Sequence, residues 1–201
     1  MKIIGITGQS GAGKSTVCTL FEKYGVPCVN TDEVYHSMLC KNSPLVCELV
    51  REFGLEITDW CGGIHRSTLA KIVFSSKEKL EALNIIAHFH ILSRSREMIK
   101  QYEKEGFDTV LVDASQLFES GFDKECDITL AVTAEKQTLT ERIMKRDKIS
   151  REAAEKRLAN QYSADYFKER CTYVIENDFD INALESSVKN IVNIIKGGTN
   201  G

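Results

Sequence analysis

The feature that most constrains this chain is a glycine-rich segment, Gly5–Thr16, that lies between an apolar run and a helical pattern. The preceding run, Lys2–Thr7, is short and rich in branched residues, which is typical of a buried strand. In the following run, Val17, Leu20 and Phe21 recur at helical spacing. The order of strand, glycine loop and helix predicts the first βα unit of an α/β fold.

The segment contains the pattern G-x-x-x-x-G-K-[ST] of a phosphate-binding loop, from Gly8 to Ser15. Glycines let successive backbone N–H groups point into one concavity, and a helix N-terminus adds partial positive charge. We expect Lys14 to reach the β- and γ-phosphates of ATP and the Ser15 hydroxyl to hold Mg²⁺. The predicted phosphate-binding residues are Gly8, Gly11, Ala12, Gly13, Lys14, Ser15 and Thr16. A dinucleotide fingerprint does not fit, because Lys14-Ser15-Thr16 follows Gly13.

The composition predicts a soluble, cytoplasmic protein. A net charge of −3 gives no indication of a nucleic-acid surface. No apolar run approaches the ~18 residues of a membrane span, and the N-terminal residues do not resemble a signal peptide. Seven cysteines without a C-x-x-C pair indicate buried or half-buried thiols in a reducing compartment, and neither a zinc site nor a disulfide framework. We expect a monomer or a weak homo-oligomer.

Strand-like segments alternate with helical patterns along the chain, which predicts a mostly parallel five-stranded sheet flanked by helices, the P-loop nucleoside triphosphate hydrolase fold. The predicted strands are Lys2–Thr7, Val26–Val29, Phe107–Asp113, Asp127–Val132 and Tyr173–Ile175. The last helix follows Asp180, a candidate N-cap, and carries one apolar stripe. We expect the tail from Lys196 to Gly201 to fray.

Two regions interrupt this alternation and divide the single predicted domain. The core is expected at about 1–35, 106–141 and 171–196. Residues of about 36–105 are too helical for one crossover, so they are expected to form an inserted substrate-binding subdomain. Residues of about 142–170 are charged and rich in arginine, and are expected to form a lid.

Two aspartates follow predicted strands, at the sheet edge where ligands of open α/β folds bind. Asp32 follows the second strand, and we expect it beside the phosphate loop as a proton acceptor or a Mg²⁺ ligand. The alternative is that Asp32 or Thr31 is the N-cap of the next helix. Asp113 ends the third strand, as a Walker B aspartate would, and the alternative is a structural loop-start residue.

Basic residues of the predicted lid share one helix face. Arg142 and Arg146 are four residues apart, and we expect them to neutralise charge on the transferred phosphoryl group. A solvated helix face is the alternative. Arg157 and Gln161 are also four residues apart, so the interpretation as one face of the lid applies to them as it does to Arg142 and Arg146.

For two residues of the predicted helical insertion, the sequence pattern alone leaves the choice between a structural and a functional role open. His88 shares a polar helix face with Asn84, beside a stripe expected to comprise Leu80, Leu83, Ala87 and Ile91, and a lone histidine is more often structural than functional. Arg66, which follows a Gly-Gly turn, is ambiguous by itself.

The order of these motifs resembles the dephospho-coenzyme A kinase family over nearly the whole chain. The resemblance rests on "GITGQSGAGKSTV", "VNTDEVYH", "IHRSTLAKIVF", "LNIIAHFHI", "VLVDASQLFES", "RIMKRD", "KRLANQ" and "YVIEND". It implies a nucleotide-binding core, a helical coenzyme-A-binding subdomain and a lid. The implied reaction uses ATP and Mg²⁺ to phosphorylate the 3′-hydroxyl of the acceptor ribose.

The resemblance also implies roles for individual residues. Gly11 to Thr16 would bind the ATP phosphates, Asp32 would be the base, and Arg142 and Arg146 match the lid. Together with Lys14, the residues Asp32, Arg142 and Arg146 are the candidate catalytic residues. Arg66 and His88 match acceptor-side positions, and Asp32 and Asp113 join them as substrate-binding candidates. Mg²⁺ would be held by Ser15, with Asp32 or Asp113 as a further ligand.

This chain departs from the family pattern at several positions. Asn30 replaces the first acid of an Asp-Ala-Asp triplet, which leaves Asp32 as its one acid. The other departures are Ser115 and Gln116 in place of Pro-Leu, Phe89 and Ser163 in place of prolines, and Phe167 at a lysine position.

The alternative activities are a kinase acting on another nucleoside or nucleotide, and a nucleotide-dependent switch module. A switch is disfavoured because guanine-specifying Asn-Lys-x-Asp motifs are absent from the sequence, whereas a candidate base and a candidate lid are present.

Overall fold

The computed structural model describes residues 1–197, and its internal contacts divide the chain into two units. The first unit comprises Met1–Val29 and the chain from Tyr102 onward. The second comprises Asn30–Gln101. The predicted subdivision into core, acceptor subdomain and lid is defined by function and stays a prediction.

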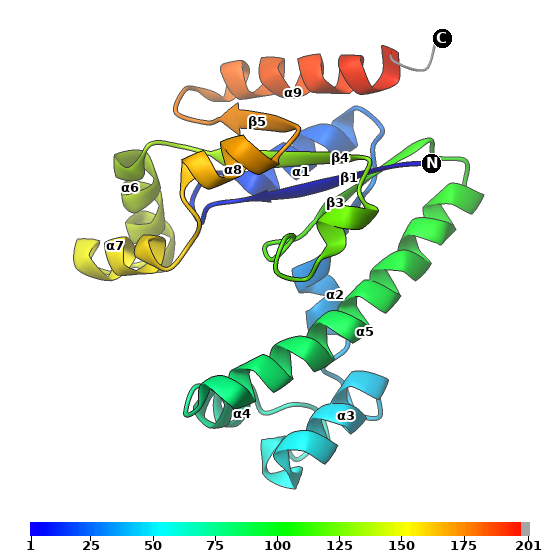
Figure 1. Ribbon diagram of the computed structural model, residues 1–201, viewed down its shortest axis with the longest axis vertical. Helices are drawn as coiled ribbons and strands as arrows, with labels where there is room; N and C mark the ends of the chain where they lie inside the picture. Colours follow the sequence, from blue (N-terminus) through cyan, green and yellow to red (C-terminus); the bar gives the residue numbers. More distant parts are fainter. Residues whose placement is uncertain (198–201) are drawn as a thin grey trace. The chain divides into compact units, whose positions relative to one another are not determined.

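A five-stranded sheet in the order β2-β3-β1-β4-β5 organises the first unit (Figure 1). The strands are β1 (Lys2–Gly8), β2 (Cys28–Asn30), β3 (Thr109–Asp113), β4 (Ile128–Thr133) and β5 (Tyr173–Glu176). The pairs β1–β3, β1–β4 and β4–β5 are parallel, with Ile4 opposite both Leu111 and Ile128. All five predicted strands and the predicted fold class are confirmed. The carboxyl ends of β1 and β3, which carry Gly8 and Asp113, therefore come to the same edge of the sheet.

The core of the first unit forms because the central strands are apolar on both faces. Every residue of β3 is buried, and so are Ile4 and Ile6 of β1. Helices α1 (Lys14–Lys23) and α9 (Ile181–Gly197) contact each other and bury their apolar stripes in the same cluster as β1 and β4. Full burial of one such apolar side chain contributes roughly 1.5–3 kcal/mol, so this cluster fixes the position of the loop that joins β1 to α1.

Helix α9 begins where the sequence predicts. The Asp180 carboxylate accepts hydrogen bonds from the backbone N–H groups of Asn182 and Ala183, at 2.9 and 3.0 Å. The predicted fraying is wrong for Lys196 and Gly197, because α9 continues through both. The rest of the predicted frayed tail, residues 198–201, lies outside the described part of the chain.

The segment between β4 and β5 forms three short helices. They are α6 (Lys136–Asp147), α7 (Arg151–Ala159) and α8 (Ala164–Arg170), and Figure 1 shows α6 and α7 side by side, in agreement with their contacts. Ser150 and Ser163 cap α7 and α8 through their hydroxyls. The predicted start of the lid at residue 142 falls inside α6, whose Leu139 and Ile143 are buried in the core of the first unit.

The second unit is helical and has its own apolar cluster. Its elements are α2 (Thr31–Ser37), α3 (Pro44–Phe53), the 3₁₀ turn η1 (Leu55–Ile57), α4 (Arg66–Val73) and most of α5 (Lys77–Lys104). The cluster includes Leu45, Leu49 and Ile57, with Leu80 and Leu83 packed against it. The predicted α5 stripe is wrong in part, since Ile86 is buried with Ala87 while Ile91 is only half-buried.

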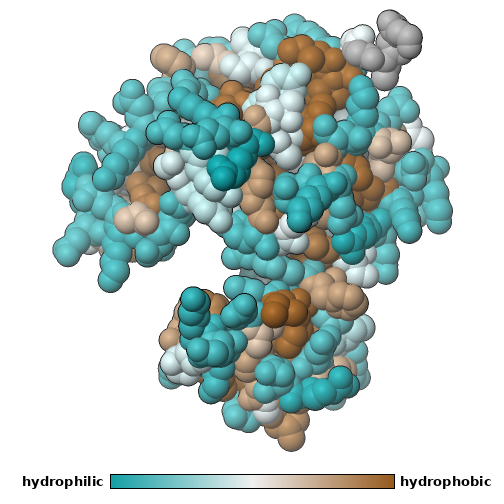
Figure 2. All heavy atoms as spheres, in the orientation of Figure 1, coloured by the Kyte–Doolittle hydropathy of each residue, from teal (hydrophilic) through white to brown (hydrophobic). Residues whose placement is uncertain are grey.

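The surface in Figure 2 is mainly hydrophilic on the face that it displays. Among the described residues, no helix combines the length and the apolar character needed to cross a bilayer. All seven cysteines are free thiols. The prediction that they are buried or half-buried is wrong for Cys40, Cys47 and Cys61, which are exposed on the second unit.

Candidate phosphoryl-transfer site

The phosphate loop joins β1 to α1 and depends on its glycines. Gly11 and Gly13 have φ values of 83° and 93°, in the left-handed region that glycine adopts without penalty. A Cβ on Gly13 would lie 2.4 Å from Asn177 Nδ2, and one on Gly8 would lie 2.2 Å from the Val132 carbonyl oxygen. The backbone therefore takes a path that is open to glycine alone, with the N-terminus of α1 directly after it.

Lys14 forms an ion pair with Asp113, the last residue of β3. Their side chains are 16% and 6% exposed, so the pair is largely removed from water. Lys14 Nζ also lies 3.4 Å from Ser115 Oγ. The structure thus brings together the predicted phosphate-binding lysine and the predicted Walker B aspartate.

The residues near the loop fit a triphosphate with Mg²⁺. Ser15 is an exposed residue in the first turn of α1, and Asp113 supplies a carboxylate. Mg²⁺ is commonly held by one or two protein oxygens together with substrate phosphates. Within residues 1–197, no group of three or more His, Cys, Asp and Glu side chains could hold a metal by itself.

Both predicted lid arginines reach the phosphate loop. Arg142 Nη1 donates to the Gly11 carbonyl at 3.4 Å, and Arg146 Nη2 donates to Ser10 Oγ at 3.0 Å. They share one face of α6, as their spacing predicts. Each guanidinium is in contact with the loop, but the side chain of Arg146 is 56% exposed, so this part of the helix face is also solvated.

Asp147, the last residue of α6, binds two arginines. Arg146 donates to both of its carboxylate oxygens, at 2.8 and 3.0 Å, and Arg157 of α7 donates to Oδ2. Hydrogen bonding from Arg146 is the largest cause that lowers the pKa of this carboxyl to about 2. The carboxylate is therefore ionised throughout the physiological range.

Three residues outside both the loop and the predicted site also hold the loop, namely Asn177, Gln161 and Tyr162. Asn177, buried directly after β5, donates from Nδ2 to the Ala12 carbonyl at 2.7 Å. Gln161 Oε1 accepts the Ser10 N–H at 2.8 Å, and Gln9 Nε2 lies 3.3 Å from the Tyr162 carbonyl. The signal for Asn177 was its position at the carboxyl end of a predicted parallel strand, the edge where Asp32 and Asp113 were sought.

Asp32 lies in the second unit, in the first turn of α2. The alternative that Asp32 or Thr31 caps this helix is wrong. The cap is Asn30, whose Oδ1 accepts the N–H groups of Asp32 and Glu33 at 2.9 and 3.1 Å. Asp32 is exposed.

The acceptor-side candidates also lie in the second unit. Arg66 is exposed at the start of α4, and its charge partly offsets the effect of burial, which raises the pKa of Tyr35. His88 is half-buried on α5. The sequence reasoning missed His90, whose Nε2 lies 2.6 Å from Glu48 Oε2 and joins α5 to α3.

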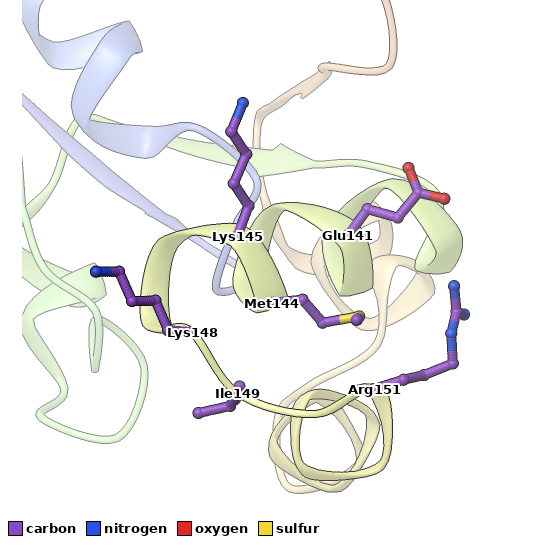
Figure 3. Close-up of a pocket in the computed structure, with 6 residues that line it drawn as sticks. All are labelled: Glu141, Met144, Lys145, Lys148, Ile149 and Arg151. Carbon is purple, nitrogen blue, oxygen red and sulfur yellow. The ribbon is translucent and has the colours of Figure 1, made fainter.

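A hollow of about 400 Å³ lies between α6 and α7, and its lining includes none of the predicted site residues. Its lining comprises Glu141, Met144, Lys145, Lys148, Ile149 and Arg151. Figure 3 shows the amino groups of Lys145 and Lys148 pointing away from Met144 and Ile149. Because its cations do not converge, we assign this hollow no part in phosphate binding.

The parallel sheet, the glycine loop at the end of β1 and the basic residues around that loop define a P-loop kinase. A solved shikimate kinase from Acinetobacter baumannii shares this fold, with a TM-score of 0.56 at 16% identity and coverage of 100% of this chain and 96% of the other. That likeness concerns the fold alone.

Closer comparisons define the family. The family model for dephospho-CoA kinase (CoaE) matches residues 2–183. The dephospho-CoA kinase of Fusobacterium nucleatum is 37% identical over 187 residues, which cover 93% of this chain and 95% of that one. The solved dephospho-CoA kinase of Campylobacter jejuni has a TM-score of 0.73 at 27% identity, with 99% and 100% of the two chains covered. This chain belongs to the dephospho-CoA kinase family, whose members are ATP-dependent kinases.

Proposed function

We propose that this protein transfers the γ-phosphate of ATP to the 3′-hydroxyl of dephospho-coenzyme A, which gives coenzyme A and ADP. The observation that carries the proposal is the set of cationic groups around the phosphate loop, in a chain that matches the family over residues 2–183. Lys14 belongs to the loop and pairs with Asp113 at the end of β3. Arg142 and Arg146 each donate a hydrogen bond to the loop. Three cations around one glycine loop suit a ligand with several negative charges.

In this proposal the loop and the cations stabilise the charge of the transferred group. The backbone N–H groups of residues 8–16 hold the phosphates, and Lys14 neutralises the β- and γ-phosphate oxygens. Arg142 and Arg146 stabilise negative charge that spreads over the phosphoryl group in the transition state. Asn177 keeps the loop in shape by its bond to Ala12.

Ser15, with Asp113, would hold Mg²⁺ against the phosphates. When bound, the ion neutralises phosphate charge and orients the triphosphate for in-line transfer. Asp113 already faces Lys14, so the same carboxylate would orient the lysine.

Asp32 is the proposed general base, and the resemblance to the family carries this assignment. Its carboxylate would accept the proton of the 3′-hydroxyl as that oxygen forms its bond to the γ-phosphorus. The bond from the γ-phosphorus to the bridging oxygen breaks, and ADP leaves with that oxygen. Asp32 is free of the capping role that would otherwise explain an aspartate at this position, since Asn30 fills it.

Two further roles are proposed for whole segments of the chain: binding of the acceptor and closure of a lid. We propose that residues of about 36–105, with Arg66 and His88, bind dephospho-coenzyme A, and that residues of about 142–170 act as the lid. Arg66 provides an exposed cation for an acceptor phosphate. We further propose a cytoplasmic enzyme that acts as a monomer or a weak homo-oligomer.

A panel of acceptors tests the proposal. ADP release is measured with dephospho-coenzyme A, adenosine, AMP and shikimate, each at equal concentration with ATP and Mg²⁺. The proposal expects dephospho-coenzyme A to give the highest kcat/KM by at least about tenfold, a difference of about 1.4 kcal/mol in transition-state binding. Preference for a nucleoside or nucleotide would instead indicate a different small-molecule kinase, and acceptor-independent hydrolysis would indicate a nucleotide switch.

A further inference from the structure

We propose that Asp147 is a positioning residue of the reaction, which holds Arg146 and Arg157 in the orientation that they need for phosphoryl transfer. The inference rests on the proposed function, because it assumes that these arginines face the transferred group. Asp147 itself contacts no part of the phosphate loop in any hydrogen bond of the structure; it contacts the arginines.

The geometry at Arg146 is a two-point fork. Arg146 Nε donates to Asp147 Oδ1 at 2.8 Å, and Nη2 donates to Oδ2 at 3.0 Å. Two parallel N–H···O bonds between neighbouring residues fix the plane of the guanidinium as well as its position. The same Nη2 donates to Ser10 Oγ at 3.0 Å, so the fixed plane presents the arginine to the phosphate loop.

Arg157 extends the arrangement to a second helix. Its Nη1 donates to Asp147 Oδ2, the same oxygen that receives Arg146 Nη2. Asp147 ends α6 and Arg157 lies on α7, so one carboxylate joins two of the three helices that contribute to the predicted lid. The side chain of Asp147 is 23% exposed, against 56% for Arg146 and 43% for Arg157.

The charge arrangement explains why a carboxylate suits this position. Two guanidinium groups that approach one triphosphate repel each other, and a shared anion between them reduces that repulsion. Asp147 remains ionised at neutral pH because hydrogen bonding to the arginines lowers the pKa of its carboxyl. An exposed ion pair contributes little to stability, so this cluster serves orientation more than folding.

The first test is steady-state kinetics of Asp147→Asn with ATP and dephospho-coenzyme A. We expect kcat to fall about tenfold, while the Kd of ATP changes less than about threefold, because orientation matters most in the transition state. Asp147→Glu should recover a substantial part of kcat, since it keeps the carboxylate. The matched control is Glu155→Gln, which removes a lid carboxylate whose partner Arg151 lies 3.6 Å away; its kcat should equal that of the wild type.

A double-mutant cycle with Arg146→Ala tests whether Asp147 acts through the arginine. In the Arg146→Ala background, Asp147→Asn should lower kcat less than about threefold further, since only Arg157 is left to orient. If the losses in kcat from the two single substitutions multiplied in the double variant, the inference would be contradicted. A wild-type kcat for Asp147→Asn would contradict it as well.

A second readout does not depend on turnover, so it separates failure of this inference from failure of the proposed function. The Nε–H resonance of Arg146, assigned by its loss in Arg146→Lys, should exchange slowly with solvent in the wild type and rapidly in Asp147→Asn. Unchanged exchange would overturn the role of Asp147 even in an active enzyme. Absence of turnover with dephospho-coenzyme A in the wild type, together with the expected change in exchange, would instead overturn the proposed function.

Discussion

Lys14 and Asp113 form an ion pair that joins the phosphate loop to the end of β3. The two residues are 99 positions apart in the sequence, and the parallel pairing of β1 with β3 brings them together. A charged pair this far removed from water is weak evidence for stability, because desolvation opposes the attraction. Its position beside the phosphate loop is the one that the proposed roles of Lys14 and Asp113 require.

Lys14→Ala should lower kcat by at least about 10²-fold, because it removes a positive charge that faces the transferred phosphoryl group. The measurement is the initial rate of ADP release in the presence of dephospho-coenzyme A. Lys23→Ala, an exposed lysine at the other end of α1, is the control and should leave the rate unchanged. A folded Lys14→Ala variant with wild-type turnover would overturn the site.

Arg142→Ala and Arg146→Ala should each lower kcat and kcat/KM together, by about 10²-fold, while ATP binding weakens less. The reason is that both guanidinium groups touch the loop and meet the phosphoryl charge as it develops. Lys145→Ala removes a positive charge from the same helix and serves as the control. If either arginine variant loosened ATP without a change in kcat, that residue would have a binding role only.

Asp32→Asn should lower transfer by ~10²–10⁴-fold, the usual contribution of a general base. Since Asn30 caps α2, the substitution leaves the cap untouched, and the melting temperature should stay within about 2 °C of the wild type. Calorimetry should show unchanged ATP affinity. The comparison variant is Glu33→Gln, the neighbouring exposed acid; if it lost more activity than Asp32→Asn, the base would have to be reassigned.

Gly13→Ala should weaken nucleotide binding by more than about tenfold, a loss of about 1.4 kcal/mol. Its Cβ would lie 2.4 Å from Asn177 Nδ2 and so displace the side chain that holds Ala12. Gly25→Ala is the control, since Gly25 also has a positive φ but a Cβ there meets nothing within 4 Å. Both variants carry a backbone penalty of roughly 1–2 kcal/mol, and only Gly13→Ala should lose nucleotide affinity.

The stability of the protein should fall at high pH partly through Cys126. Burial raises the pKa of this thiol from 9.0 to about 12, and the thiol donates to the Phe122 carbonyl at 3.3 Å. Because the pKa of this thiol is higher in the folded than in the unfolded state, its contribution to the free energy of unfolding is fully present below pH 9. That contribution is lost as the pH rises toward 12, since the unfolded state then releases the proton more readily. Urea unfolding from pH 8 to 11 should show a smaller pH slope for Cys126→Ala, by up to one proton, or about 1.4 kcal/mol per pH unit. An unchanged slope would show that the thiol does not titrate in this way.

The sequence predicted the sheet well because its strands are short apolar runs bounded by turns, a local signal that buried parallel strands carry strongly. The signal for the glycine loop was equally local, since the spacing of its residues alone predicts that Lys14 and Ser15 lie at a helix start. The capping of α9 by Asp180 followed from one residue type at one position.

Contacts that depend on tertiary packing could not be predicted in the same way. Asn177 and Gln161 reach the loop from distant parts of the chain, 165 and 151 positions away. Asn177 follows a predicted strand and Gln161 has the helical spacing of the lid arginines, but neither pattern shows which backbone group the side chain will contact. The choice of Asn30 over Asp32 as the cap depends on where β2 ends, and strand ends are the least certain part of a sequence-based assignment. On α5, Ile86 joins the apolar cluster of the second unit and Ile91 is only half-buried, because burial depends on which neighbours the helix packs against, and helical spacing alone does not show them.

The most direct measurement of the central claim is the stoichiometry of ADP release and of acceptor phosphorylation, with ATP, Mg²⁺ and limiting dephospho-coenzyme A. We expect one ADP per acceptor consumed, a product that phosphorus NMR shows to be phosphorylated at the 3′-oxygen, and almost no ADP without the acceptor. ADP release that continues at the same rate without dephospho-coenzyme A, or a product phosphorylated elsewhere, would contradict the claim.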